Sequence, residues 1–442
     1  MRIAWFTPFS RSSAIGRFSA AVTAELSRHA EVELWHPWTS TAHEARVRQV
    51  SFRSACDIPP GRLDEYDLVI YNFGNHLPFH REIYEISRQT PGLCILHDFV
   101  MQHFFAAYFL EHLRQPHRYV QLMERHYGEP GRRAAEASLA RRGPPLWETD
   151  AVMEFPLFEP AIQGAYGVIT HAEFFRQRVE AVFAGPVARL HLPYTPPPAT
   201  DIPPRRALGV SEERVLAVTV GHVNRNKRVR SVLEVLAKHS DLRARILYAV
   251  LGPADPDYER ELRELIARWS LQDCVRLLGY VDDRLLAAYL HHADFCINLR
   301  FPVTEGASAS LAEQMLLGKP VIVARIGCYQ EIPDDCAVKV APTGASEELA
   351  QALRKLALDP AARQAIGIRA KEFADNHFQP RHYAQRLLDF AWQVRTAKPL
   401  LKLADGLASE LANLGIDQAT DQQTRLVQDL ARECARLFGA GK

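Results

Sequence analysis

The sequence predicts an α/β protein made of two doubly wound, Rossmann-like units, and three observations support this prediction. Short apolar runs alternate with helix-forming stretches, which is the pattern of strands and crossover helices around a parallel sheet. The proline-rich segment His191–Pro204 interrupts this alternation, and after it the same pattern starts again. With 442 residues, the chain is also too long for a single hydrophobic core.

Composition narrows the function classes. The formal net charge is +1 and no basic stripe spans either unit, which argues against nucleic acid as a partner. The seven cysteines form no CxxC pair and no zinc-type spacing, so a reduced, cytoplasmic protein is expected. The first strand starts at Arg2 without a signal-type segment, and no apolar run of about 18 residues predicts a membrane span.

The first unit is expected over residues 1–195 and opens with a strand, a small polar loop and a helix. Ligands bind where parallel strands end, so Gly16 in this first loop is a candidate ligand contact. The loop lacks the GxGxxG fingerprint, which argues against a dinucleotide. The predicted strands are 1–9, 31–38, 66–72, 93–96 and 167–170, and the first helix is expected over 19–28.

His97 directly follows the apolar run Leu93–Leu96. A histidine at a strand end is more often a satisfied core or loop residue than a functional one. Its place at the carboxyl edge of the predicted sheet nevertheless favours contact with a ligand.

A helical insertion is expected at about residues 100–160, where the strand–helix alternation stops. Within it, residues 113–142 carry seven arginines against three glutamates. One interpretation is a solvated helical face. The other is a basic surface that contacts an acceptor or makes peripheral contact with an anionic membrane.

The second unit is expected over residues 205–377 and repeats the doubly wound pattern. Asp282 and Asp283 are adjacent rather than spaced as Asp-x-Asp, so we expect them to cap the helix that starts at Arg284. The predicted strands are 215–220, 245–252, 275–278, 293–299, 321–323 and 337–340, and the first predicted helix of the unit is 229–238.

The loop after the first strand of this unit is rich in cations. His222, Arg225 and Lys227 lie between that strand and the following helix. Cations are unfavourable at a helix N-terminus, so their presence there predicts an anionic ligand. A diphosphate leaving group is such a ligand, because its charge can be stabilised by fixed cations and backbone donors.

The stretch Arg300–Pro320 places two glutamates around a helix start. Glu305 lies in the predicted turn and Glu313 lies two turns into the predicted helix, which ends at Gly318. A carboxylate accepts hydrogen bonds from sugar hydroxyls, and N–H groups at a helix N-terminus bind phosphate. The backbone groups expected to bind phosphate belong to Ala307, Ser308, Ala309 and Ser310.

These motifs resemble the donor site of the retaining GT-B glycosyltransferases of family 4. Glu305, seven residues, Glu313 and then Gly318-Lys319-Pro320-Val321 match that family's signature, and Lys227 matches the lysine of its Gly-Arg, four residues, Lys motif. His222 stands where the family has arginine, and either Arg225 or Arg228 is a candidate to compensate for this difference. The resemblance covers most of residues 1–395.

The resemblance implies a GT-B fold, in which two Rossmann-like domains face each other across a cleft. Glu305 would contact hydroxyls of the donor sugar, Glu313 would hold the nucleotide ribose, and His97 would lie against the sugar. Lys227 would stabilise the diphosphate charge. The nucleotide base is expected near Tyr280 and Val281.

The implied activity is a hexosyltransferase reaction. The enzyme would transfer a sugar, with retention and without metal or other cofactor, from a nucleoside-diphosphate sugar to a glycan, lipid-linked or small-molecule acceptor. The alternatives are a sugar phosphorylase and a nucleotide-sugar-binding protein without turnover. A phosphorylase would need a pyridoxal-binding lysine, and no lysine in the sequence is singled out for that role.

The C-terminal region is expected to be helical. Residues 378–395 resemble the terminal GT-B helix that crosses back to the first domain. Residues 399–442 show leucines at helical spacing and predict an amphipathic helical pair. This pair would either pack on its own domain or form a self-association surface for a homo-oligomer.

Overall fold

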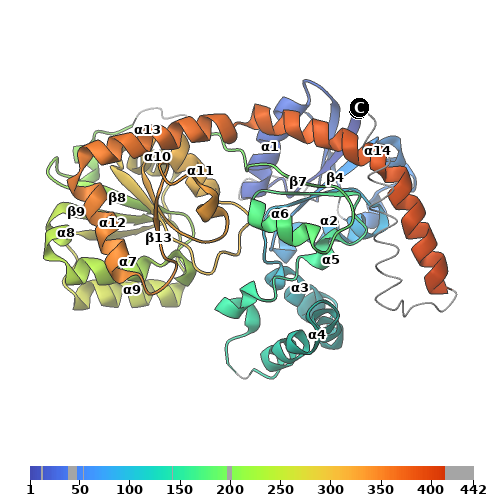
Figure 1. Ribbon diagram of the computed structural model, residues 1–442, viewed down its shortest axis with the longest axis horizontal. Coiled ribbons are helices and arrows are strands. Elements are labelled where there is room, and N and C mark those ends of the chain that lie inside the picture. The colour runs from blue at the N-terminus through green and yellow to red at the C-terminus, as the bar shows by residue number, and fades with distance from the viewer. Residues whose placement is uncertain (11–12, 38–46, 53, 142, 197–201, 414–442) are drawn as a thin grey trace. The chain divides into compact units, whose positions relative to one another are not determined.

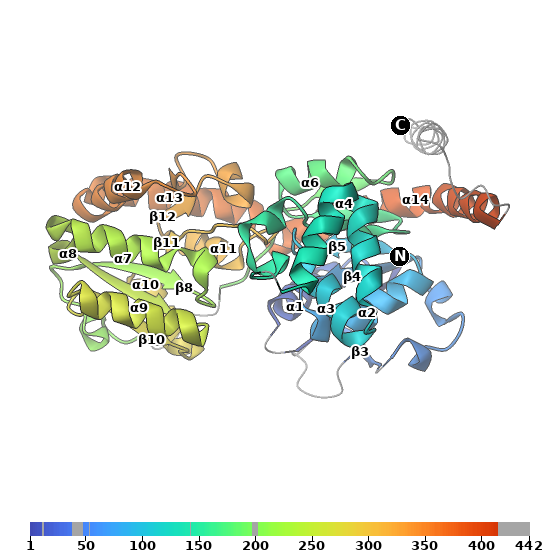
Figure 2. The ribbon, with the colours of Figure 1, turned by 90° about the horizontal axis from the view of Figure 1, so that it is seen from below.

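The computed structural model describes residues 1–10, 13–37, 47–52, 54–141, 143–196 and 202–413. The chain folds into two compact units, and Figures 1 and 2 show that each unit has one sheet with helices on both faces. None of the helices in these ranges is long and apolar enough to cross a membrane. Unit 1 comprises Met1–His191, Thr304–Ala307 and Pro380–Lys442, and unit 2 comprises Leu192–Val303 and Ser308–Gln379.

Unit 1 holds a seven-stranded parallel sheet in the order β3-β2-β1-β4-β5-β6-β7. The inner strands are buried on both faces, which is why they form continuous apolar runs in the sequence. The sequence does not predict the edge strands β3 and β7, because their residues form no apolar run. The strands are β1 (Arg2–Phe6), β2 (Glu31–His36), β3 (Arg48–Ser51), β4 (Leu68–Phe73), β5 (Leu93–Leu96), β6 (Gly167–Thr170) and β7 (Val187–Arg189).

The helices of unit 1 cover this sheet. Helix α1 starts at Ala14 rather than at Ser19, because the side chain of Ser13 caps it by accepting a hydrogen bond from the Gly16 N–H at 3.1 Å. Gly16 therefore lies in the first turn of a helix and not in the predicted loop. The helices are α1 (Ala14–Leu26), α2 (Leu77–Gln89), α3 (Gln102–Ala107), α4 (Pro116–Leu139), α5 (Glu159–Ile162) and α6 (Glu173–Glu180).

The insertion is helical, as the sequence predicts. Helix α4 is broken at Gly128, whose φ of 64° and ψ of −153° turn the chain, so α4 consists of two helical parts (Figure 1). Arg132 pairs with Glu129 and Glu136, each at 2.7 Å. No large apolar side chain described in the insertion is exposed. The pairing of Arg132 is what a solvated helical face predicts.

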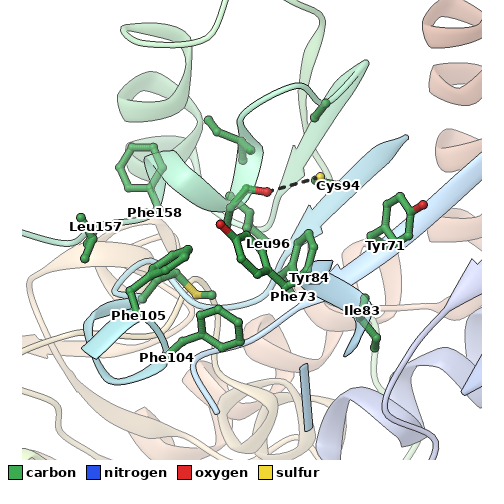
Figure 3. Packing of buried hydrophobic residues seen from close by; sticks show 14 of the residues in the cluster. Tyr71, Phe73, Ile83, Tyr84, Cys94, Leu96, Phe104, Phe105, Leu157 and Phe158 are labelled. Atoms are coloured by element: carbon green, nitrogen blue, oxygen red, sulfur yellow. Dashed lines mark hydrogen bonds between the residues drawn. The ribbon is translucent and has the colours of Figure 1, made fainter. Parts of the chain in front are cut away.

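The insertion is anchored to the sheet by aromatic packing. Figure 3 shows Phe104 and Phe105 of α3 close to Tyr84 of α2 and Phe73 of β4. The ring centroids of Tyr84 lie 5.4 Å from those of Phe104 and Phe105, with edge-to-face geometry. The insertion is therefore part of the core of unit 1.

Unit 2 holds a six-stranded parallel sheet in the order β10-β9-β8-β11-β12-β13. The chain runs outward from β8 to β10 and then returns to place β11 beside β8. This reversal makes the carboxyl ends of β8 and β11 the topological switch point, where doubly wound sheets bind ligands. The strands are β8 (Val215–Val220), β9 (Ile246–Leu251), β10 (Val275–Gly279), β11 (Phe295–Asn298), β12 (Val321–Ala324) and β13 (Val338–Val340).

The helices of unit 2 follow the predicted signals closely. Asp282 caps α10, as predicted, by accepting a hydrogen bond from the Leu285 N–H at 2.8 Å. Gly318, just past the end of α11, has the positive φ of 68° that favours glycine. The helices are α7 (Val229–Lys238), α8 (Ser240–Arg245), α9 (Pro256–Arg268), α10 (Asp283–His292), α11 (Ala309–Leu316), α12 (Ser346–Leu358) and α13 (Pro360–His377).

The C-terminal helix differs from the prediction. The two helical segments expected on either side of residues 396–398 form one helix, α14 (Pro380–Asn413), which continues through Pro399. Its first half packs against α1 in unit 1. The remainder of the predicted helical pair, residues 414–442, lies outside the described residues.

Candidate active site

Lys227 lies at the carboxyl end of β8 in unit 2. A short 3-10 turn, Arg225–Lys227, folds the side chain back so that its Nζ donates a hydrogen bond to the carbonyl oxygen of Val220. The residue is only 4% exposed. A lysine is rarely buried to this degree without anionic or hydrogen-bonding partners, so its position marks the switch point as chemically distinctive.

The other two predicted cations of this loop point elsewhere. The Nε2 of His222 lies 2.7 Å from the Oδ1 of Asp255, and both side chains are half exposed. The Nη2 of Arg225 pairs with the Oε2 of Glu261 at 2.7 Å, and its guanidinium lies over the ring of Tyr258 at 5.1 Å. Arg225 is therefore held against α9, and this arrangement does not support the idea that it compensates for His222.

The N-terminus of α11 lies at the carboxyl end of β11. Ser308 is 8% exposed and caps the helix by accepting a hydrogen bond from the Leu311 N–H at 3.3 Å. The Nδ2 of Asn298, at the end of β11, lies 3.0 Å from the Oγ of Ser310 and 3.2 Å from the Oε1 of Gln314. These contacts fix both serine hydroxyls and the first-turn N–H groups at the end of the strand. Such a helix start attracts anions.

Glu313 lies on α11 and is 5% exposed. Burial raises the pKa of the Cys296 thiol in β11 to about 12, and the charge of Glu313 acts in the same direction. A carboxylate this deeply buried is uncommon on a helix that has only a structural role.

Glu305 lies in unit 1, because hydrogen bonds attach the segment Thr304–Ala307 to the end of β5. The N–H groups of Phe99 and Val100 both donate to the Thr304 carbonyl at 3.0 Å, and the Gly306 N–H donates to the His97 carbonyl at 2.9 Å. A Cβ on Gly306 would lie 2.8 Å from that oxygen, so only glycine allows this approach. The structure thus brings the predicted residues His97 and Glu305 into neighbouring positions.

Asp98 is a site residue that the sequence reasoning missed. It forms an antiparallel bridge with Glu305, and its Oδ2 accepts a hydrogen bond from the Asn75 N–H at 2.7 Å. Burial, together with the nearby charge of Glu305, raises the pKa of Asp98 to about 6. The only signal in the sequence is its position directly after His97 at a strand end.

His97 is part of a buried hydrogen-bonded chain. Its Nε2 lies 3.0 Å from the Oδ1 of Asn72, and its Nδ1 lies 3.2 Å from the Nε2 of His171. The Nδ1 of His171 lies 2.9 Å from the Leu190 carbonyl oxygen. The Asn72 amide is oriented by its Nδ2, which donates to the Phe6 carbonyl at 2.9 Å.

This chain of contacts needs three protons, because four ring nitrogens lie in a row between two oxygen acceptors. Two neutral imidazoles supply only two N–H protons. Burial holds the pKa of His97 well below its usual range and lowers that of His171 to about 4. Both rings are therefore neutral near pH 7, and one of the three contacts lacks its proton.

The predicted base contacts lie two strands away from β8. Tyr280 is 81% exposed and Val281 is partly buried, and both follow the end of β10. The end of β10 is joined to β9 through the Gly252 N–H, which donates to the Gly279 carbonyl at 2.7 Å. Both residues thus stand at the same carboxyl edge as Lys227.

Unit 2 also contains a cavity of about 160 Å³, which is lined by residues of α7, α12, β12 and β13 and of the neighbouring loops. Its wall includes Leu299, which packs in the core between the sheet and helices α7 and α12, whereas Glu313 lies on α11. Of the cations predicted in the loop after β8, Arg228 lines it, whereas Lys227, Glu305 and Glu313 do not. We place the candidate site at Lys227 and α11 because the buried charged groups and the helix N-terminus lie there. The cavity is lined by Arg228, Ser231, Glu234, Leu299, Ala324, Val340, Ala341, Pro342, Thr343, Gly344, Ala345, Ser346 and Leu349.

Comparison with known proteins finds a family match in the second half of the chain. Residues 203–373 match the family model "Glycosyl transferases group 1", so this segment carries a glycosyltransferase group 1 domain. The match covers Lys227, Tyr280, Glu305 and Glu313. It includes most of unit 2.

Two curated relatives illustrate the sequence similarity. A D-inositol 3-phosphate glycosyltransferase of Kribbella flavida is 25% identical over 185 residues, which is 40% of this chain and 43% of the relative. The amylovoran biosynthesis glycosyltransferase AmsK of Erwinia amylovora is 28% identical over 146 residues, 32% of this chain and 35% of the relative. The chain thus spans less than half the length of these relatives.

Solved structures establish the fold. Sucrose-phosphate synthase from Thermosynechococcus elongatus aligns with a TM-score of 0.61 at 16% identity, covering 89% of this chain and 99% of that one. HepE from Anabaena, solved with UDP, aligns with a TM-score of 0.59 at 17% identity, covering 88% and 99%. With its parallel sheets of seven and six strands, the protein has the GT-B fold, which confirms the predicted fold class.

Proposed function

We propose that this protein is a retaining, metal-independent glycosyltransferase that takes its sugar from a nucleoside-diphosphate sugar. The observation that carries the proposal is the buried Lys227 at the end of β8, with the N-terminus of α11 at the end of the adjoining strand. A diphosphate leaving group gains negative charge as its bond to the sugar breaks, and fixed cations and N–H donors stabilise that charge. The group 1 domain match over the same segment supports this reading.

Each unit has its own task in the proposal. In unit 2, Lys227 and the first turn of α11 bind the diphosphate, and the buried carboxylate of Glu313 accepts hydrogen bonds from the ribose diol. In unit 1, Glu305 accepts hydrogen bonds from hydroxyls of the transferred sugar. His97, at the carboxyl end of β5, orients that sugar by contacting it.

The acceptor class is inferred from chemistry and from the relatives. D-inositol 3-phosphate and amylovoran, which appear in the relatives' names, are both rich in hydroxyl groups. The HepE structures hold UDP or UDP-glucose, which supports a nucleoside-diphosphate donor. We therefore propose a glycan, lipid-linked or small polyhydroxyl acceptor.

One observation favours a second candidate, a nucleotide-sugar-binding protein without turnover. His222 replaces the arginine of the family motif and is paired with Asp255. Such a protein would bind the donor but would not release nucleoside diphosphate.

The experiment is a donor screen that measures both binding and release of nucleoside diphosphate for UDP-, GDP- and ADP-sugars. Lys227→Ala should lower turnover by about 10²- to 10³-fold, because it removes charge stabilisation. Glu313→Ala should weaken donor binding by about 10- to 100-fold through loss of a charged acceptor. Arg225→Ala is the matched control, since its side chain is held on α9, and it should change neither quantity.

Two results would contradict the proposal. If no donor binds to the wild-type protein, both candidate functions fail. If a donor binds and no nucleoside diphosphate is released with any hydroxyl-bearing acceptor, the binding protein is the better description.

A further inference from the structure

The cavity of about 160 Å³ in unit 2 lies where three neighbouring strands end. Its buried apolar wall includes Leu299, which directly follows β11, and Ala324 and Val340, the last residues of β12 and β13. These three strands adjoin one another in the sheet. The carboxyl ends of parallel strands are where doubly wound sheets bind ligands, and the donor site at Lys227 and α11 leaves this part of the edge without a role.

The rest of the wall comes from α7, α12 and the loop that follows β13. Ser231 lies near the start of α7, and Ser346 is the first residue of α12. In the loop, Thr343 and Gly344 are exposed, so the cavity is open to solvent on that side. All the lining residues belong to unit 2, which therefore builds this cavity by itself.

Arg228 places a positive charge in the wall of the cavity. Its Nε donates a hydrogen bond to the Oγ of Ser231 at 3.2 Å. Within the described ranges, no carboxylate pairs with this guanidinium, and its two terminal amino groups have no hydrogen-bond partner. Glu234, the other charged residue of the wall, is paired with the Nε of Arg230 at 2.8 Å. The charge that the cavity offers to a ligand is therefore that of Arg228.

The backbone of Arg228 is unusual for a residue with a side chain. Its φ of 56° lies in the left-handed region, which favours glycine. Residues held in this region cluster at ligand sites, where the surrounding structure keeps them in place. The position thus retains a long cationic side chain at some cost in backbone strain.

The size and lining of the cavity indicate the class of ligand. An engineered apolar cavity of about 150 Å³ takes up benzene, so this one has room for a small organic molecule. The side chains of Leu299, Ala324, Val340 and Leu349 suit a hydrocarbon part. The guanidinium of Arg228 is a planar fork that can donate two parallel hydrogen bonds to a phosphate or a carboxylate.

We propose that this cavity is a second ligand site of unit 2, which binds a small organic anion. The charged group of the anion is held by Arg228, and its hydrocarbon part lies among the buried strand ends. The site goes beyond the proposed function. Arg228 directly follows Lys227 in the chain, but Lys227 does not line the cavity. Arg228 therefore serves this cavity rather than compensating for His222.

The test is calorimetry on the full chain with phenyl phosphate and benzoate, beside phenol and inorganic phosphate, which carry only one half of the proposed ligand. At least one of the two organic anions should bind about tenfold or more tightly than phenol and inorganic phosphate. Arg228→Asn should weaken that binding by about 10- to 100-fold, because it removes a charged donor, and asparagine tolerates the left-handed backbone. Arg225→Gln removes a cation of the same loop that does not line the cavity, and it should bind the anion like the wild type.

A second variant keeps the charge and fills the space. Ser231→Leu should also weaken binding of the anion about tenfold or more, since its larger side chain occupies the cavity. Wild-type affinity in both Arg228→Asn and Ser231→Leu would place the anion elsewhere, for example at Lys227, and would overturn the proposal. If Arg228→Asn does not fold, Ser231→Leu decides. Failure of both organic anions to bind at millimolar concentration, or binding no tighter than that of inorganic phosphate, would overturn it as well. The proposed function is tested separately, with nucleoside-diphosphate sugars.

Discussion

The carboxyl edges of the two sheets differ in the charge that they bury. In unit 1 the strand ends carry Asn72, His97 and His171, which are hydrogen-bonded to one another. In unit 2 the strand ends carry Lys227 and Arg300, each at most 8% exposed. The same doubly wound architecture thus buries a pair of neutral histidines at the strand ends of one unit and a lysine and an arginine at those of the other.

Under the proposed function, this difference matches the two kinds of ligand that the donor contains. A transferred sugar is neutral and is recognised by hydrogen-bonding groups, whereas a diphosphate needs fixed positive charge. Burial disfavours the charged form of an imidazole but leaves a guanidinium charged. The choice of histidine or arginine at a buried strand end therefore decides which kind of ligand the edge can serve.

The neutral state of the histidine pair at the unit 1 edge is testable through pH. The pKa of His171 is lowered to about 4 by burial, and its unfolded value is near 6.5. The unfolded state binds the proton more tightly, so this contribution to stability is full above pH 6.5 and is lost progressively as the pH falls from 6.5 to 4. Between pH 7 and pH 4, the free energy of unfolding should therefore fall by about 3 kcal/mol less in His171→Gln than in the wild type. Urea denaturation between pH 4 and 7.5, followed by hydrogen exchange of β5 and β6 peptides, measures it for unit 1.

The groups that face the histidine pair set the control. They include His80 of α2 and Tyr383 of α14, and Asp98 directly follows His97 in the chain. The pKa of Asp98 is raised to about 6, so its contribution has the opposite sign and is lost as pH rises from 4 to 6. Asp98→Asn should therefore steepen the loss of stability on acidification. If the pH dependence of the free energy of unfolding is the same in His171→Gln as in the wild type, His171 is not held neutral in the folded protein.

The second prediction concerns activity and the division between the units. His97→Ala should lower the rate of sugar transfer by about two orders of magnitude, because one positioned polar group is removed. Nucleotide affinity should remain close to that of the wild type, since the nucleotide is assigned to unit 2. Calorimetry with the nucleoside diphosphate and a transfer assay with a matched donor and acceptor measure the two quantities. Loss of nucleotide binding, or full transfer, would contradict the division.

Local signals made much of unit 2 predictable from the sequence. The helix that follows Glu305 is correctly placed, because serines mark its start and Gly318 marks its end. The capping role of Asp282 is likewise predicted correctly from its position directly before a helix. These features depend on interactions between residues only a few positions apart.

The parts of the site that escaped prediction depend on residues far apart in the chain. The bridge of Asp98 with Glu305 places the acidic turn in unit 1, although the sequence puts it within the second domain. The orientation of Arg225 is set by Tyr258 and Glu261, which belong to another helix. No local pattern in the sequence encodes such partners, so residue type and spacing identified the loop but not the directions of its side chains.

The smallest expected effect separates a helix start that binds a ligand from one that does not. Ser308 caps α11 and Asp282 caps α10, and each side chain accepts an N–H hydrogen bond from the residue three positions on. Either substitution by alanine should cost unit 2 about 1 kcal/mol of stability, because a helix N–H loses its partner. Stability alone therefore cannot distinguish the two caps.

Affinity for nucleoside diphosphate can distinguish them. If the first turn of α11 binds the diphosphate, Ser308→Ala should also weaken that binding by about three- to tenfold, since a net hydrogen bond contributes roughly 1 kcal/mol. Asp282→Ala should leave binding unchanged, because its helix starts at the end of β10 and is assigned no phosphate. Equal affinities in the two variants, at equal stability, would mean that α11 is an ordinary helix start. The proposed diphosphate site of unit 2 would then rest on Lys227 alone.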